Sequence, residues 1–235
     1  MSLPSVAYVL ELNTFAELRS ACMLVEGMHP KHRALATLDD LGQALYTSGH
    51  AIVSHDLDRV EGHDLSNLPS DVFEDGDHVG YFSTPEEFAL RAENFRSERQ
   101  TQPVSGKTLD WVDANTGASL DQVNASPETL LDQVSVIMAV PVERACDAIA
   151  AFPNGYFSCD LSPFEMYALC EKMEEVGYDL FAIGASYLAF EARDGAGSGA
   201  GGMSEILTSL YVGPDLDALI SSLEMQSYVI LRYTE

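Results

Sequence analysis

Histidine and carboxylate side chains gather in the first third of the chain, and this combination could hold a metal ion. All six histidines lie between residues 29 and 78, and those from residue 50 onward alternate with Asp and Glu. Imidazole and carboxylate groups are the usual ligands of Zn, Mn and Fe. One interpretation of the sequence is therefore a metal-dependent hydrolase, with His50, Asp56, Asp58 and His63 as candidate ligands.

The spacing of these residues does not favour a metal site. The pattern of apolar residues predicts a strand at Ala51–Ser54. If residues 50–58 are extended, His55 lies on the apolar face, while His50 and Asp56 point to the opposite face. We therefore interpret His55 as a hydrogen-bonded core histidine.

Two further patterns fall short of a cofactor site. The stretch Asp71–Asp77 gathers carboxylates around Gly76, but it lacks the register and the closing glutamate of a calcium loop. A G-x-G-x-x-G match at Gly197, Gly199 and Gly202 lies between a predicted strand and a predicted helix, yet alternating Gly and Ala also describes a flexible loop. The sequence contains no nucleophile elbow, P-loop or H-E-x-x-H motif. We expect no metal, no cofactor and no catalytic residue.

The charge of the chain is its most informative property. Against 12 Lys and Arg stand 37 Asp and Glu, so the formal net charge of the 235 residues is -25. Because contacts to phosphate need Lys or Arg, this balance argues against nucleic acid and anionic membranes as direct partners. The acids are spread among apolar residues along the whole chain, so the charge coats a fold rather than a disordered tail.

The favoured interpretation is a non-enzymatic acidic binding protein that neutralises or inhibits a basic protein. It would act as a nucleic-acid mimic or as an immunity or antitoxin-type protein. A third interpretation is that the acidity is an adaptation to high salt, since only three of the 12 basic residues are Lys. The oligomeric state is left open. The predicted partner-binding acids are Asp56, Asp58, Glu61, Asp64, Asp71, Glu74, Asp75 and Asp77, with Glu171, Glu174 and Glu175 as a second acidic face.

These side chains must be positioned by helices and strands, and two halves of the chain show a similar order of them. The first half opens with a strand at Ala7–Leu12 and a helix whose Thr14 and Glu17 form a capping box. The second half opens with a strand at Ser135–Val140 and a helix over residues 142–152. This parallel order is consistent with an internal duplication.

The order continues along each half. The first half has a helix capped by Thr37 that stops at Gly49, followed by the strand Ala51–Ser54. The second half has a helix over Ser162–Gly177, in which Ser162 and Glu165 form a capping box, and a hairpin over Leu180–Phe190. The sequence predicts α+β architecture with two similar βααβ-type halves, ferredoxin-like or related, with antiparallel sheets and helices on one face. The remaining predicted elements are helices at Glu205–Tyr211 and Leu216–Leu223 and a strand at Tyr228–Tyr233.

Composition divides the chain into three parts. Residues 1–96 form the N-terminal half with the acidic loop 56–78, and residues 131–235 form the C-terminal half. Residues 97–130 are rich in polar residues, which predicts a long connection between the halves. Within it, Trp111 is predicted to latch onto a domain surface.

Targeting signals and cysteine usage point to one compartment. The N-terminus lacks the basic and apolar regions of a signal peptide, and the most continuous apolar stretch is too short to span a bilayer. The sequence thus predicts a cytoplasmic protein. Because Cys22, Cys146, Cys159 and Cys170 show no C-x-x-C spacing, we expect reduced thiols in the core.

Overall fold

A six-stranded sheet forms the centre of the computed structural model, which describes residues 6–101, 107–114, 116–195, 200–213 and 215–234. The strand order is β1-β6-β2-β7-β8-β10. Every neighbouring pair is antiparallel except β2 and β7, which are parallel. The bounds are β1 Ala7–Leu10, β2 Arg33–Thr37, β6 Ser135–Val140, β7 Tyr178–Ile183, β8 Tyr187–Ala192 and β10 Tyr228–Arg232.

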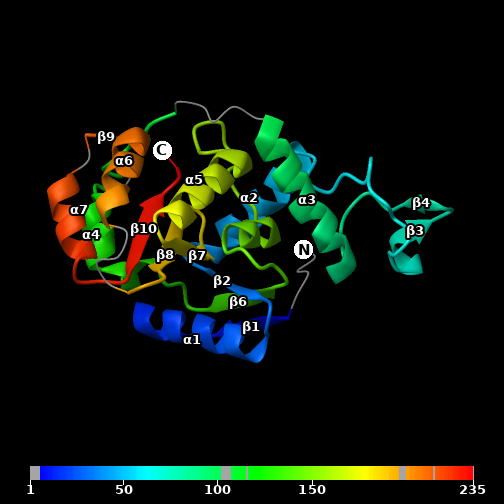
Figure 1. The fold of residues 1–235 in the computed structure, drawn as a ribbon, viewed down its shortest axis with the longest axis horizontal. Helices are drawn as coiled ribbons and strands as arrows, with labels where there is room; N and C mark the ends of the chain where they lie inside the picture. Colours follow the sequence, from blue (N-terminus) through cyan, green and yellow to red (C-terminus); the bar gives the residue numbers. More distant parts are fainter. Residues whose placement is uncertain (1–5, 102–106, 115, 196–199, 214, 235) are drawn as a thin grey trace.

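Helices cover both faces of this sheet (Figure 1). Helix α1 (Phe15–Met28) packs on β2 and β6 from one side, and α5 (Pro163–Glu175) packs on β7 from the other. Helix α3 (Pro85–Thr101) lies against α5 and the 3-10 helix η3 (Cys146–Ala151). The remaining elements are α2 Leu41–Ser54, α4 Leu120–Ala125, α6 Ala200–Leu210, α7 Leu216–Leu223, η1 Ser70–Val72, η2 Pro127–Leu130, and the strand pairs β3 Phe73–Glu74 with β4 Asp77–His78 and β5 Leu109–Asp110 with β9 Tyr211–Val212.

The α+β class is confirmed, with a mostly antiparallel sheet. The strands of the two predicted halves are interleaved, because β6 lies between β1 and β2. Helices on both faces correct the expectation of helices on one face. The ferredoxin-like halves and the internal duplication stay predictions.

Local capping signals correctly predicted the starts of two helices. The predicted capping boxes at Thr14 with Glu17 and at Ser162 with Glu165 are both formed, and they begin α1 and α5. Each box satisfies backbone N–H groups that the first helical turn would otherwise leave unpaired. The predicted hairpin is also confirmed, as β7 and β8.

The predictions around α2 are wrong in two respects. Residues 51–54 continue α2 instead of forming a strand, and the buried residues Ala44, Ser48 and Ala51 recur at helical spacing. The helix begins after Asp40 and not after the predicted cap Thr37, and the Asp40 side chain accepts a hydrogen bond from the backbone N–H of Gln43. Residues 33–37, which were not predicted as a strand, form β2 in the centre of the sheet.

The segment predicted as a helix over residues 142–152 contains the shorter η3. The polar connection is also more structured than predicted, since β5, α4 and η2 lie within it. Trp111 is buried and meets Tyr211 edge-on with 5.6 Å between ring centroids, which confirms the predicted latch. Of the glycine motif, Gly197 and Gly199 lie outside the described residues, and Gly202 lies in α6.

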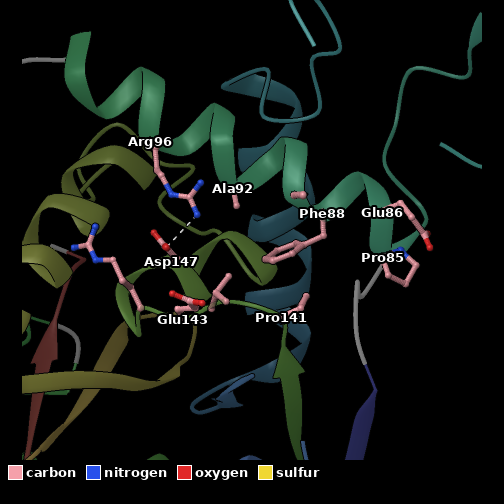
Figure 2. Close-up of a pocket in the computed structure, with 11 residues that line it drawn as sticks. Pro85, Glu86, Phe88, Ala92, Arg96, Pro141, Glu143 and Asp147 are labelled. Carbon is pink, nitrogen blue, oxygen red and sulfur yellow. Dashed lines mark hydrogen bonds and ion pairs between the residues drawn. The ribbon is translucent and has the colours of Figure 1, made fainter. Parts of the chain in front are cut away.

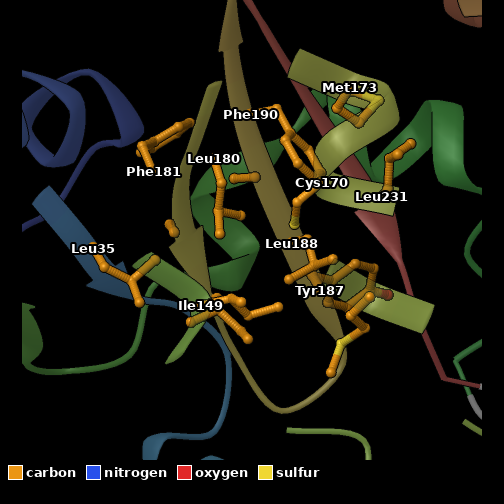
Figure 3. Close-up of a cluster of buried hydrophobic side chains, with 14 of the residues drawn as sticks. Leu35, Ile149, Cys170, Met173, Leu180, Phe181, Tyr187, Leu188, Phe190 and Leu231 are labelled. Atoms are coloured by element: carbon orange, nitrogen blue, oxygen red, sulfur yellow. The ribbon is translucent and has the colours of Figure 1, made fainter. Parts of the chain in front are cut away.

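The core is built from the inner faces of the sheet and the helices that cover it (Figure 3). Leu180, Leu188 and Phe190 of the hairpin pack with Cys170 and Met173 of α5. All four cysteines are free, as predicted, and three of them are buried. Cys159 is exposed, which corrects its assignment to the core.

Gly184 marks a close approach between the segments that follow the two parallel strands. A Cβ atom at this position would lie 2.8 Å from the backbone nitrogen of Asp39 and would also clash with the Asp39 carboxylate. Replacing Gly184 by Ala should therefore lower the free energy of unfolding by about 2 kcal/mol. A urea titration measures the change.

The matched control is Gly49→Ala in α2, where a Cβ atom would meet no other atom within 4 Å. Alanine is a better helix former than glycine, so the free energy of unfolding of this variant should rise by about 0.5 to 1 kcal/mol. Equal effects at the two positions would contradict the close approach at Gly184.

Candidate functional site

Residues 56–84 leave the body of the molecule after α2 and return to it at α3, and we call this segment the acidic arm. Its hairpin of β3 and β4 projects away from the sheet (Figure 1). The hairpin turns at Asp75 and Gly76, whose φ angles of 52° and 94° fit the turn that Asp-Gly favours between two strands. The arm carries eight Asp and Glu but only one Arg.

The first attachment of the arm to the body is the buried carboxylate of Glu87, in the first turn of α3. It accepts hydrogen bonds from the backbone N–H groups of Ser83 and Thr84, both at 2.7 Å, and from the Thr84 hydroxyl at 2.9 Å. His78 Nε2 lies 2.6 Å away on its other side. Because His78 Nδ1 accepts from the Gly80 N–H, the ring proton sits on Nε2 and is donated to Glu87.

These contacts change the acidity of Glu87. Burial raises the pKa of its carboxyl, but the hydrogen bonds from Ser83, His78 and Thr84 outweigh burial and hold the pKa below its ordinary value. Glu87 is therefore an anion at neutral pH. The N-terminus of α3 and the hairpin are held together by one charged group.

A second attachment is the ion pair between Asp58 and Arg91. Arg91 donates from Nε at 2.6 Å and from its terminal nitrogen at 2.9 Å, which is a bidentate geometry. The same carboxylate accepts from the backbone N–H of Phe82 at 3.0 Å, and the guanidinium lies over the Phe82 ring. Asp58 thus joins the base of the arm to α3, and its charge is already paired with Arg91.

A third attachment is Asn94, which is buried. Its side-chain amide donates to the carbonyl oxygens of Leu57 and Arg59, and its oxygen lies 2.7 Å from His63 Nε2. Arg59 in turn forms an ion pair with Glu98.

The three attachments share one stripe of α3. Glu87, Arg91 and Asn94 recur at helical spacing beside the apolar stripe of Phe88, Ala92 and Phe95, so both stripes are buried. This polar stripe was not predicted from the sequence. The spacing of Glu87, Arg91, Asn94 and Glu98 was the signal that could have revealed it.

The acids that the arm presents are uncompensated. Every one of the nine Arg residues pairs with an acid, as Arg19–Glu191, Arg33–Asp179, Arg59–Glu98, Arg91–Asp58, Arg96–Asp147, Arg99–Glu171, Arg144–Glu174, Arg193–Asp179 and Arg232–Asp113. Of the eight predicted acids in the arm, only Asp58 has an ion pair within the described parts of the chain. The other seven are exposed: Asp56, Glu61, Asp64, Asp71, Glu74, Asp75 and Asp77.

The second predicted acidic face differs from the arm. Glu171 pairs with Arg99 at 3.2 Å, and Glu174 pairs with Arg144 at 2.9 Å and accepts from the Cys146 N–H. Burial raises the pKa of Glu174, but these partners hold it below its ordinary value. Glu175 is exposed. This face is therefore largely neutralised.

The four candidate metal ligands do not converge. His50 lies between the rings of Tyr46 and Tyr156, and Asp56 is exposed. Asp58 binds Arg91, and His63 faces Asn94. Nowhere in the described ranges do three His, Cys, Asp or Glu side chains come together as metal ligands could. His55 ends α2 and meets Phe164 edge-on, with its pKa lowered by burial.

A cleft of about 550 Å³ lies between α3 and the segment that follows β6 (Figure 2). Phe88 and Ala92 supply apolar walls, and Arg96 reaches across to Asp147, with 3.1 Å between nitrogen and oxygen. The second Asp147 oxygen accepts from the Tyr167 hydroxyl at 2.6 Å. Both oxygens of this buried acid are therefore occupied, and Arg96 is already neutralised.

Comparisons with known proteins give no family assignment. No family model matches the chain, and neither a curated protein nor a solved structure shows significant similarity to it. Among the helices that the structure describes, none combines the length and the apolar character needed to cross a membrane.

Proposed function

We propose that this protein is a non-enzymatic acidic binding protein that engages a basic partner protein through the acidic arm. The observation that supports the proposal is that the ion pairs leave the exposed acids of the arm without a positive partner. Every Arg is paired with an acid, whereas seven arm acids are exposed and have no ion pair among the residues that the structure describes. The proposal includes the cytoplasmic location expected from the sequence.

The attachments of the arm support the same proposal. Contacts to Glu87, Arg91 and Asn94 tie the arm to α3 at both of its ends and at His63 and His78, which limits the conformational freedom that the arm loses on binding. Complementary charge speeds the encounter of two proteins and disfavours wrong partners. Two biological forms fit this chemistry: an inhibitor that presents carboxylates where a nucleic acid would present phosphates, and an immunity or antitoxin-type protein.

Neutralising the arm tests the proposal. We expect the variant Asp71→Asn, Glu74→Gln, Asp75→Asn and Asp77→Asn to lose at least about tenfold in affinity for basic proteins captured from a host lysate at low salt. The wild type should release these proteins at ~1 M salt, where charges are screened within about 3 Å. Quantitative mass spectrometry of the captured proteins measures both effects.

The control variant removes the same charge elsewhere on the surface. Glu128→Gln, Glu205→Gln, Asp217→Asn and Glu224→Gln are all exposed positions outside the arm, so this variant should capture the same proteins as the wild type. Capture that survives 1 M salt, or that is equal for both variants, would contradict the proposal. Stoichiometric Zn, Mn or Fe in the purified protein would instead favour the metal-dependent hydrolase, and stability that rises steeply with KCl would favour salt adaptation.

A further inference from the structure

Three aromatic side chains and a histidine form one exposed cluster on the outer surface of α2. Tyr46 and His50 are one helical turn apart, with 4.3 Å between ring centroids, and His50 lies 4.8 Å from Tyr156 in the segment that precedes α5. Phe157 continues the series at 5.3 Å from Tyr156. Together with Val53, the next turn of α2, these residues form what we call the aromatic patch.

Four members of the patch are exposed side chains with large apolar surfaces. The exposed fractions are 57% for Tyr46, 80% for Val53, 36% for Tyr156 and 45% for Phe157. Contiguous apolar groups at a protein surface mark interaction sites. Tyrosine is also among the residue types that contribute most to binding energy in interfaces.

Acidic residues flank the patch at both ends of α2. Its two segments, residues 34–58 and 145–171, contain no Lys or Arg. Lys107 reaches the residues that follow Phe157, where its ammonium donates to the carbonyl oxygens of Ser158 and Asp160 and lies 3.8 Å from Glu165. Exposed Asp40 stands at the N-terminus of α2 and exposed Asp56 at its C-terminus. The backbone N–H of Asp56 donates to the carbonyl oxygen of Val53 at 3.3 Å, so the first acid of the arm directly adjoins the patch.

This charge selects the kind of partner that the patch fits. A second copy of the chain would bring another net charge of -25 against the same acids. Like charges that face each other across an interface weaken binding by several kcal/mol. A basic protein meets the acids favourably and can place apolar side chains on the rings. Burial of such anchors supplies affinity that screened surface charges do not.

We infer that the aromatic patch is the apolar anchor site for the same basic partner that the acidic arm attracts. The inference rests on the proposed function and adds to it the residues that hold the partner after encounter. The arm governs how fast the partner arrives and how binding depends on salt. The patch governs how long the partner stays.

Selection from a random peptide display library tests the inference, because the library samples many peptide chemistries at once and the partner need not be identified. Peptides are selected on the wild type and then measured on the patch variant Tyr46→Gln, Val53→Gln and Phe157→Ser. We expect peptides that bind the wild type at least about tenfold more tightly than the patch variant. These peptides should carry a net positive charge together with aromatic or aliphatic residues.

A control variant removes exposed apolar groups elsewhere, by Met23→Gln and Leu24→Gln on α1 and Met225→Gln. It should bind the same peptides as the wild type. All of these positions are exposed, so thermal melting of both variants should match the wild type and show that they are folded.

The inference is overturned if no peptide discriminates the patch variant, if the discriminating peptides are neutral or acidic, or if the control variant loses as much affinity as the patch variant. It is also overturned if sedimentation shows a wild-type dimer that the patch variant lacks, since a second copy is then the occupant. The variant Asp71→Asn, Glu74→Gln, Asp75→Asn and Asp77→Asn separates the two proposals. If it no longer captures basic proteins while the patch variant still captures them, the inference fails and the proposed function stands.

Discussion

Replacing Glu87 by Ala should lower the free energy of unfolding by about 3 kcal/mol. The substitution leaves the N–H groups of Ser83 and Thr84 without their acceptor and removes the anion that binds His78. The His78 side chain is only 3% exposed, so its unpaired donor keeps the full cost of leaving water, which makes this loss larger than that of one exposed hydrogen bond. Urea titration at pH 7 measures the change.

The variant Glu87→Gln separates charge from shape, since an amide oxygen can still accept while the charge is lost. We expect the free energy of unfolding of Glu87→Gln to lie between those of the wild type and Glu87→Ala. Glu86→Ala, the exposed neighbour in the same helical turn, should change stability by less than about 0.5 kcal/mol. A loss at position 86 equal to that at position 87 would contradict the role of Glu87 as a buried attachment.

The pH dependence of this contact has a defined sign. Because the pKa of Glu87 is lower in the folded protein than in the unfolded chain, its contribution is complete above the ordinary glutamate pKa. The contribution is lost as the pH falls through the lowered value. The stability difference between wild type and Glu87→Gln should therefore shrink on acidification.

Replacing Asp39 by Asn should stabilise the protein by about 3 kcal/mol at pH 8 and have little effect at pH 4. Asp39 follows β2, where its largely buried carboxylate packs against Gly184. Burial raises the pKa of Asp39 to about 7, because donors from Ser186 and Tyr187 compensate for burial only in part and the charge of Asp40 adds to the rise. One carboxylate oxygen, Oδ1, has no hydrogen-bond partner among the described residues.

The sign follows from linkage. The folded-state pKa of Asp39 lies above its value of 3.8 in the unfolded chain, so the contribution of this group to stability is fully present below 3.8. It is lost as the pH rises toward 7. Other acids titrate over the same range, so the difference between wild type and variant at each pH isolates Asp39.

Asp71→Asn is the matched control, because it removes the same charge from an exposed position. Thermal unfolding of the wild type and both variants from pH 4 to pH 8 measures the effect. A difference between wild type and Asp39→Asn that does not grow with pH, or equal curves for the two variants, would contradict a buried and partly unsatisfied carboxylate at position 39.

The sequence by itself determined the features that depend on neighbours along the chain. The capping boxes of α1 and α5 join residues three apart, and the hairpin of β7 and β8 joins adjacent strands. Such contacts form wherever the local residues allow them. The net charge is likewise a sum over residues, so the expectation of a basic partner needed no coordinates.

Only the tertiary structure decided which acids are available. Arg91 and Asp58 are 33 residues apart, and Arg19 and Glu191 are 172 apart, so no local pattern connects them. The same holds for α2, whose residues 51–54 are apolar enough for a strand but are held as helix by buried Ala44, Ser48 and Ala51. The physical reason is that burial and ion pairing depend on distance in space, which the folded chain sets after local propensities have been satisfied.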